Sequence, residues 1–239
     1  MKKLITGVLA MLFVAAGFSQ QTIVNDPNVE KRNVEGSFDV ITISNAIDLY
    51  LSQGNEEAVA VSASDTKYRD RIRAEVKNGT LKIWFEHENG WKWNEGNKKM
   101  KAYVSVKNLK KLSSSGASDV FVNGTLRVPE LAVALSGASD FKGAVDTRNL
   151  AVHISGASDM TVSGSATNVI VDASGASDFK GYDLVSQTCD AEASGASDIK
   201  ITVNTELTAS ASGASDIRMK GSGVIRKGNS SGASSVKKI

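Results

Sequence analysis

An aspartate that recurs at regular intervals is the most conspicuous reactive group in the sequence. It closes the pentapeptide Ser-Gly-Ala-Ser-Asp, whose copies begin at residues 115, 136, 155, 174, 194 and 212. The aspartates are Asp119, Asp140, Asp159, Asp178, Asp198 and Asp216, and a seventh copy ends in Ser235 instead. Carboxylates that repeat in this way are groups that can share a calcium ion or form the acid and base of a glycoside hydrolase.

Neither chemistry suits these aspartates well. Calcium takes roughly six to eight oxygen ligands, but a mostly cationic position that repels a metal ion follows the last residue of every copy after the first by two residues: Lys142, Thr161, Lys180, Lys200, Arg218 and Lys237. A glycosidase needs two carboxyls whose environments differ, and equivalent repeats supply no such difference. We expect a structural acidic ladder beside a cationic one, with aspartate and serine side chains bonding backbone groups at the corners. The sequence therefore predicts no metal site and no cofactor.

The other nucleophiles and bases form no recognisable catalytic set. The single cysteine, Cys189, cannot make an internal disulfide or a zinc knuckle. The only histidines are His87 and His153, and neither lies in a known catalytic motif. We therefore assign no catalytic residue.

All three tryptophans lie in one short stretch, at Trp84, Trp91 and Trp93. Asn89-Gly90 is a strong hairpin signal, so Trp91 and Trp93 are expected on one face of the returning strand. Such a pair can stack on sugar rings, and it can equally cover the edge of a core. The three tryptophans are our candidate ligand site, with packing as the alternative.

The residues around the pentapeptide predict an all-β solenoid. Apolar residues alternate with others before each copy, as Leu150, Val152 and Ile154 do, which is typical of a strand with one buried face. A unit of about 19 residues cannot enclose its own core, so the copies must stack. We expect a single-stranded parallel β-helix with about 19-residue coils, each made of two or three short strands separated by a corner that contains Gly or Asn. Its coils are expected to be right-handed, as parallel crossovers predominantly are.

The predicted organisation has three parts. Residues 1–20 read as a signal peptide, residues 21–110 as an irregular β-rich region with degenerate coils and a Trp-rich hairpin, and residues 111–239 as the regular solenoid. In the middle part Ser44-Asn45-Ala46-Ile47-Asp48 looks like a worn copy of the pentapeptide, and residues 62–65 are a second candidate. Strands are expected at residues 80–87 and 101–106, and no segment after the signal has a convincing helical period.

The predicted signal peptide and the charge balance limit the cellular location of the protein and the class of its partners. Two lysines precede an apolar run of about 13 residues, shorter than the roughly 20 that span a membrane. Removal of residues 1–20 leaves 26 basic and 26 acidic residues, because 28 minus 2 is 26 and no acid is lost. A neutral chain argues against nucleic acid as a partner. We expect no transmembrane segment in the mature chain, which would be periplasmic, on the outer surface or secreted.

Several motifs follow one another in a fixed order. They are Phe38-Asp39-Val40-Ile41, Ser44-Asn45-Ala46-Ile47-Asp48-Leu49-Tyr50-Leu51 with Gln53-Gly54, Asn78-Gly79-Thr80-Leu81-Lys82-Ile83, and the repeated pentapeptide. Together, over about residues 32–235, they resemble the putative auto-transporter adhesin head GIN domain family. The resemblance implies an exported β-helical protein of a kind common in Bacteroidetes, and the family's name implies adhesion.

The expected function is that of a non-enzymatic, adhesin-like module of the cell envelope. Its repetitive face suits an extended partner, either a polysaccharide or another envelope or surface protein, and a purely structural rod or an oligomer subunit is a further reading. The alternative is a carbohydrate-active enzyme, a glycoside hydrolase or lyase, on a β-helix scaffold. Such an enzyme would need an irregular cleft with acids or bases that break the repeat.

Overall fold

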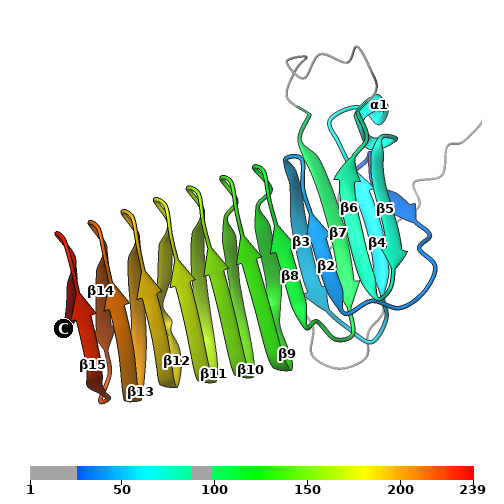
Figure 1. The fold of residues 1–239 in the computed structure, drawn as a ribbon. Coiled ribbons are helices and arrows are strands. Elements are labelled where there is room, and N and C mark those ends of the chain that lie inside the picture. Colours follow the sequence, from blue (N-terminus) through cyan, green and yellow to red (C-terminus); the bar gives the residue numbers. More distant parts are fainter. Residues whose placement is uncertain (1–25, 88–97) are drawn as a thin grey trace, which may run out of the picture.

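The computed structural model describes residues 26–87 and 98–239 of the chain. The expected signal peptide, the Asn89-Gly90 turn, Trp91 and Trp93 lie outside the described residues. All described strands belong to one 16-stranded sheet, accompanied by one short helix (Figure 1). In chain order they are β1 (Glu30–Arg32), β2 (Val40–Ile43), β3 (Ile47–Gln53), β4 (Ala58–Ser62), α1 (Thr66–Arg69), β5 (Ile72–Lys77), β6 (Thr80–Phe85), β7 (Met100–Val106), β8 (Lys111–Ser114), β9 (Val120–Leu135), β10 (Phe141–Ile154), β11 (Asp159–Ala173), β12 (Asp178–Ala193), β13 (Asp198–Ala211), β14 (Asp216–Lys220), β15 (Val224–Ser230) and β16 (Ser235–Lys238).

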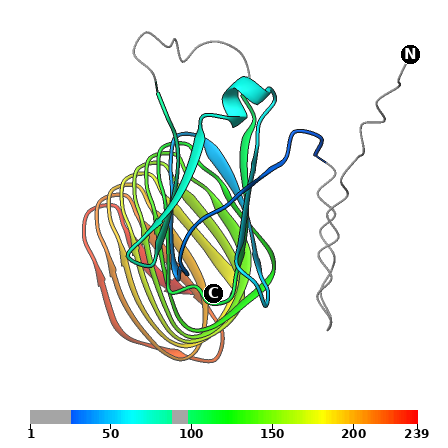
Figure 2. The same cartoon turned by 90° about the vertical axis from the view of Figure 1, so that its right-hand side faces the viewer.

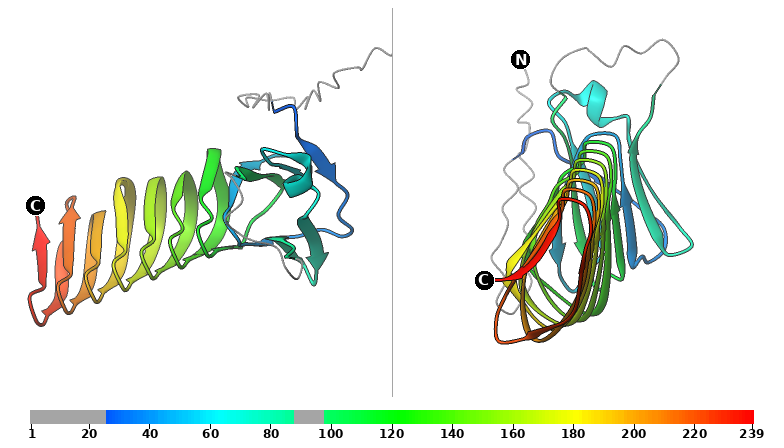
Figure 3. Two further views of the ribbon diagram at one scale, coloured as in Figure 1. Left: turned by 90° about the horizontal axis from the view of Figure 1, so that it is seen from above. Right: turned by 60° about the vertical axis from the view of Figure 1, so that its left-hand side comes forward.

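The second half of the chain is the predicted parallel solenoid. Phe141 pairs with Met160, Met160 with Phe179, Phe179 with Ile199 and Ile199 with Ile217, so successive coils are 19, 19, 20 and 18 residues apart. The coils stack side by side along one axis (Figures 1 and 3) and wind around a common interior when viewed along that axis (Figure 2). The fold class and the repeat length are therefore confirmed.

Each coil differs from the prediction of two or three separate strands. Strands β9 to β13 run without interruption for 14 to 16 residues, and parallel pairing continues around the bends of the coil. The register shift between Thr161 and Ser163 changes the pairing offset from 19 to 20 residues, so it accommodates the extra residue of the next coil. Two bends also contain a glycine in the left-handed region, Gly124 at φ 81° and Gly164 at φ 108°. The hydrogen-bond ladder therefore bends instead of breaking.

The glycine of each pentapeptide lets neighbouring corners approach closely. Gly156 has φ 81°, and a Cβ atom there would lie 2.4 Å from the carbonyl oxygen of Gly137 on the preceding coil. That same oxygen accepts a 2.8 Å hydrogen bond from the N–H of Ala157. Every later corner repeats this bond at 2.7 to 2.8 Å, so the corners form a continuous backbone ladder along the solenoid.

The second serine of the pentapeptide points inward and is fully buried. These serines are Ser118, Ser139, Ser158, Ser177, Ser197 and Ser215, each with an exposed fraction of zero. Along most of the column, the Oγ of one serine accepts the N–H of the serine on the preceding coil, as Ser158 does from Ser139 at 3.1 Å. The predicted role of serine in bonding corner backbone is thus confirmed.

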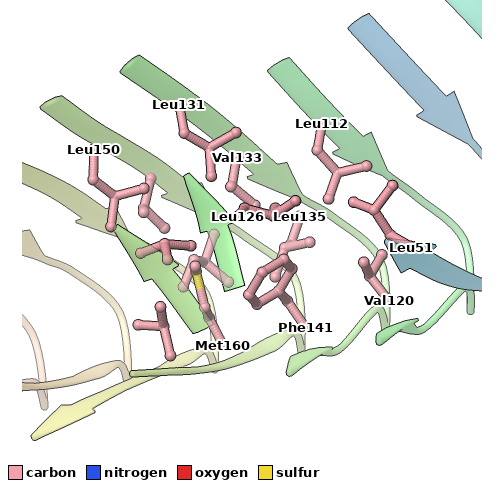
Figure 4. Packing of buried hydrophobic residues seen from close by; sticks show 14 of the residues in the cluster. Leu51, Leu112, Val120, Leu126, Leu131, Val133, Leu135, Phe141, Leu150 and Met160 are labelled. Atoms are coloured by element: carbon pink, nitrogen blue, oxygen red, sulfur yellow. The ribbon is translucent and has the colours of Figure 1, made fainter. Parts of the chain in front are cut away.

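The core is a stack of apolar layers inside the coils. Leu131, Val133 and Leu135 on β9 face inward opposite Val120 on the same coil, and Phe141 and Met160 continue the row of Val120 into the next two coils, as Figure 4 shows. All of these side chains are buried, at exposed fractions of 2% or less. The alternation seen in the sequence is therefore the alternation between core and surface.

The N-terminal region contributes two further coils in an unexpected spatial order. Strands β2 and β3 stack directly on β8 and β9, with Leu49 beside Val120. The worn motif is a true corner, because Asn45 and Ala46 have positive φ and the N–H of Ile47 donates to the Oγ of Ser118. On their other side, β2 and β3 pair in parallel with β6 and β7. The segment β2–β3 thus lies between segments that follow it in the chain.

The second candidate motif, residues 62–65, is not a coil corner. Strand β4 runs antiparallel to β7, and β1 runs antiparallel to β4. Asp65 caps α1 instead, and its carboxylate accepts the N–H of Lys67 at 2.9 Å. Ser62 occupies the place of the motif's glycine, and a serine does not readily adopt the positive φ that this corner requires. The one helix, α1, has only four residues, which is too short to produce a helical period in the sequence.

Within the described ranges, no helix has the length and apolar character that crossing a membrane requires.

Candidate functional site

The repeated aspartates form the predicted row on the outer surface of the solenoid. Asp159 pairs with Asp178, Asp178 with Asp198, and Asp198 with Asp216 on successive strands. At the start of the row, Oδ1 of Asp119 accepts the N–H of Asp140 at 3.1 Å. The aspartates therefore help to hold the corner backbone together.

The cations two residues further along neutralise the later part of this acidic row. Lys180 Nζ lies 2.5 Å from Asp159 and 3.6 Å from Asp178, and Arg218 lies 2.9 Å from Asp198 and 2.5 Å from Asp216. Hydrogen bonding to Asp159 and the charges of both carboxylates raise the pKa of Lys180 above its ordinary value, although partial burial opposes them. These paired rows have the geometry of the structural ladder that we expected.

In three neighbouring coils the same surface position carries an aromatic ring instead of a cation. Tyr50 on β3 stacks on Tyr103 of β7 with ring centroids 5.2 Å apart, and on Phe121 of β9 with centroids 5.3 Å apart. The rings are inclined to each other by 25° to 26°. All three are partly exposed, and we call Tyr103, Tyr50 and Phe121 the aromatic stack.

Carboxylates border the aromatic stack on one side. Asp48 and Asp119 lie two residues before Tyr50 and Phe121 on adjacent strands, and Lys101 is beside Asp48 on β7. Burial and the negative charge of Asp119 raise the pKa of Asp48, and a backbone hydrogen bond from Asp119 and the charge of Lys101 oppose this rise. The stack and these carboxylates form a mixed aromatic and acidic patch on one exposed face.

The N-terminal segment anchors one end of the patch. The hydroxyl of Tyr103 donates to Oδ2 of Asp26 at 3.3 Å, and Lys101 Nζ lies 4.0 Å from the same oxygen. Burial, followed by the charge of Asp26 and this hydrogen bond, raises the pKa of Tyr103 well above its ordinary value. Tyr103 therefore stays neutral and acts as a fixed hydrogen-bond donor.

Of the predicted tryptophan site, only Trp84 lies among the described residues. Trp84 is a partly buried residue of β6, where Lys82 Nζ lies 5.1 Å from its ring centroid. Strand β6 pairs with β2 and β5, whereas the aromatic stack is on β7, β3 and β9. Trp91 and Trp93 lie outside the described residues, so their role in ligand contact stays a prediction.

The other candidate groups are isolated from the aromatic stack. His153 Nδ1 is 3.3 Å from Asp172 in an exposed pair on a different face, and Cys189 is a buried thiol whose pKa is raised by burial. Across residues 26–87 and 98–239, no group of three or more His, Cys, Asp or Glu side chains has a geometry that could hold a metal ion.

A depression of about 480 Å³ lies where the N-terminal strands meet the first regular coil. Its polar lining includes Asp39, Glu57, Lys110 and Glu130. Lys110 Nζ lies 2.6 Å from Oδ2 of Asp39, so this cation neutralises one of the three acids.

The sequence reading overlooked the aromatic stack, although one signal was present. Tyr50 and Phe121 follow Asp48 and Asp119 by two residues, the offset at which all later copies but one carry Lys or Arg. A substitution of aromatic residues for cations in one column marks a local change of surface chemistry. Tyr103 had no such marker, because no motif precedes it.

Comparison with solved structures identifies the same architecture elsewhere. A putative adhesin from Bacteroides fragilis matches with a TM-score of 0.79 and 22% identity, over 88% of this chain and 96% of that one. A putative lipid binding protein from Parabacteroides distasonis gives 0.67 and 21%, over 89% and 97%. A putative adhesin from Parabacteroides merdae gives 0.68 and 16%, over 89% and 96%. A search of the curated proteins found no match.

The family comparison agrees with these structural likenesses. The family model described as "Putative auto-transporter adhesin, head GIN domain" matches residues 37–223, which include the worn first corner, the aromatic stack and the six complete pentapeptides. The family and these structural neighbours are named for adhesion or lipid binding and not for an enzymatic activity. The resemblance drawn from the motifs is confirmed, and the chain belongs to the putative auto-transporter adhesin, head GIN domain family.

Proposed function

We propose that this protein is an exported, non-catalytic binding module of the cell envelope that holds an extended polysaccharide against the outer face of β7, β3 and β9. Residues 1–20 are its proposed export signal. The observation that carries the proposal is the aromatic stack of Tyr103, Tyr50 and Phe121 with carboxylates beside it.

Sugars need both kinds of group that this patch offers. The C–H faces of a sugar ring pack against aromatic carbon, and sugar hydroxyls donate hydrogen bonds to carboxylates. Asp48 and Asp119 supply the acceptors, while the phenol of Tyr103 is already held by Asp26. The rings are fixed by their neighbours, so little side-chain entropy is lost on binding.

The ends of the aromatic stack leave ring surface available. Beyond Tyr103 the next strand carries Ala60, a single methyl group, at the paired position. Beyond Phe121 the next coil carries the exposed Lys142. No further aromatic ring therefore covers the outer faces of Tyr103 and Phe121 at these paired positions.

An extended ligand suits the surface better than a compact one. The patch occupies three coils of a sheet that continues in parallel register to β16, and neighbouring strands are about 4.8 Å apart. A polymer that lies across the strands would thus meet similar backbone geometry at each step. Adhesion by such a surface agrees with the names of the structural neighbours.

The enzymatic alternative has weaker support. A glycoside hydrolase needs one acid and one base or nucleophile in different environments across a cleft. The depression at the junction contains Asp39, Glu57 and Glu130, but Lys110 already engages Asp39. The aspartate row lies on an open outer face, where its later members are paired with cations.

The proposal is tested by measuring polysaccharide binding with aromatic variants of residues 21–239. Affinity electrophoresis against a panel of soluble envelope and host polysaccharides first identifies a binder. We expect Phe121→Ala to weaken its affinity by about tenfold or more. Tyr182→Ala is the matched control, because Tyr182 is a partly buried tyrosine further along the same solenoid.

Two results would contradict the proposal. One is the absence of binding to every polysaccharide by a folded protein, which would favour a structural rod or a protein partner. The other is a ligand whose affinity depends on Tyr182 and not on Phe121. Circular dichroism of each variant confirms that the solenoid is intact.

A further inference from the structure

The charge pattern of the solenoid changes at the aromatic stack. In the later coils each aspartate of the row has a cation within 4.0 Å: Lys180 serves Asp159 and Asp178, and Arg218 serves Asp198 and Asp216. The protein thus supplies its own countercharge there, from the column two residues after the aspartate.

The three aspartates beside the aromatic stack differ from these later members of the row. Asp48, Asp119 and Asp140 lie side by side on β3, β9 and the next corner, because Leu49 pairs with Val120 and Asp140 donates its N–H to Asp119. In the part of the chain that the structure describes, none of these three carboxylates has an ion pair within 4.0 Å.

The neighbouring lysines, Lys101 and Lys142, form no ion pair with these three aspartates among the described residues. Lys101 lies beside Asp48, but its Nζ is near Oδ2 of Asp26 at 4.0 Å and 5.9 Å from the ring centroid of Tyr50. Lys142 lies beside Phe121 and is exposed to solvent. Burial and then the negative charge of Asp119 raise the pKa of Asp48, and the charge of Lys101 only opposes this rise.

We infer that the polysaccharide bound at this patch carries ammonium groups, as a polymer of amino sugars with free amines does. This inference rests on the proposed function. An ammonium group beside Asp48 and Asp119 takes the place that Lys or Arg takes in the later coils, and the outer face of the Phe121 ring contacts the same cation. The carbon skeleton of the sugar packs on the remaining ring surface.

The same patch disfavours two other ligand classes. A polymer of uronic acids would bring carboxylates toward Asp48, Asp119 and Asp140, and like charges repel. A neutral N-acetylated polymer could pack on the rings but would leave the carboxylates without a countercharge. Charge therefore discriminates between polymers whose rings are otherwise alike.

The test compares two oligosaccharides of equal length that differ only in charge. A glucosamine hexamer and an N-acetylglucosamine hexamer are titrated by calorimetry into the protein at a mildly acidic pH, where amines are protonated. We expect the glucosamine hexamer to bind about tenfold more tightly or better. Raising the ionic strength should reduce this preference, because salt screens exposed charges.

Two carboxylate variants locate the effect. Asp119→Asn and Asp48→Asn should each weaken binding of the glucosamine hexamer more than binding of the N-acetylated hexamer, so that the preference falls. Asp216→Asn is the matched control, since Asp216 belongs to the same row but pairs with Arg218. Phe121→Ala should weaken both hexamers, because it removes the ring and no charge.

The possible results separate this inference from the proposed function. Equal affinity for the two hexamers, or binding only of neutral or acidic polysaccharides in a way that depends on Phe121, overturns the inference and leaves the proposed function standing. Absence of all polysaccharide binding overturns both. Tighter binding of a lysine-rich peptide, with the same dependence on Asp119 and Phe121, would assign the patch to a protein partner and overturn the inference.

Discussion

A single methyl group added at a corner should show how closely the coils are packed. Gly156 and Gly124 both have φ 81°, so replacement by alanine imposes the same left-handed strain of about 1–2 kcal/mol at each site. The surroundings differ, because a Cβ at Gly156 would lie 2.4 Å from the oxygen of Gly137, whereas a Cβ at Gly124 meets nothing within 4 Å.

The expected destabilisation follows from this difference. The methyl group of Gly156→Ala must push two corners apart, which adds about 1–3 kcal/mol of overpacking to the strain, for a total of about 2–5 kcal/mol. It also strains the hydrogen bond from Ala157 to Gly137. Gly124→Ala should lower the free energy of unfolding by only about 1–2 kcal/mol.

Urea denaturation followed by circular dichroism measures both free energies of unfolding. Because the two variants share the residue change and the backbone dihedral, their difference isolates the contact between corners. Equal destabilisation by the two substitutions would refute the reasoning, since it would mean that the corners relax freely.

Three other substitutions test the polar interior and the acidic row. Ser158→Ala should lower the free energy of unfolding by about 1–3 kcal/mol, because the buried N–H of Ser139 loses its acceptor; a smaller loss in thermal unfolding would show that another group replaces it. Asp48→Asn should raise the melting temperature at neutral pH and have no effect well below pH 4: a raised pKa in the folded state means that ionisation costs stability as the pH rises through it. Asp216→Asn should act in the opposite direction: the hydroxyl of Ser235 lowers the pKa of Asp216, so its contribution exists above the ordinary pKa and disappears as the pH falls through the lowered one. Melting curves between pH 3 and pH 7 would contradict this account if both asparagine variants shifted in the same direction.

The regular coils were predictable because their determinants are local. Leu150, Val152 and Ile154 alternate with polar residues within one strand, and the glycine of the pentapeptide marks a corner that needs positive φ. Both signals recur at the period of the coil, so each copy of the repeat predicts the same stacking of coils. The right-handed winding stays a prediction.

The spatial order of the N-terminal strands was not predictable in this way. Ile47 of β3 pairs with Met100 of β7, although the two residues are 53 positions apart in the chain. No motif marks this register, because the sequence between β6 and β7 does not contain the pentapeptide. The antiparallel pairing of β4 with β7 also depends on packing against partners that are distant in sequence.

The candidate site could not be predicted from the sequence, because it also depends on pairing between strands that are distant in the chain. Tyr50, Tyr103 and Phe121 meet only through the registers of β3 with β7 and with β9. A one-residue slip in either register would turn a ring from the surface toward the core. Tyr50 and Tyr103 are 53 residues apart, so nothing in the local sequence indicates their contact. The three tryptophans, in contrast, lie in one short stretch of sequence.

The coil-to-coil register has a consequence for how such a protein can change its length. Each coil from β10 to β13 pairs with its two immediate neighbours, and it offers the next coil the same glycine corner and the same serine acceptor. Duplication or deletion of one whole 19-residue unit therefore preserves the glycine corner and the serine acceptor at each junction between coils. Each such event moves the far end of the solenoid by about 4.8 Å. The distance between the aromatic stack and the far end of the solenoid can therefore change in steps of one coil, by evolution or by design, without any change in the stack itself.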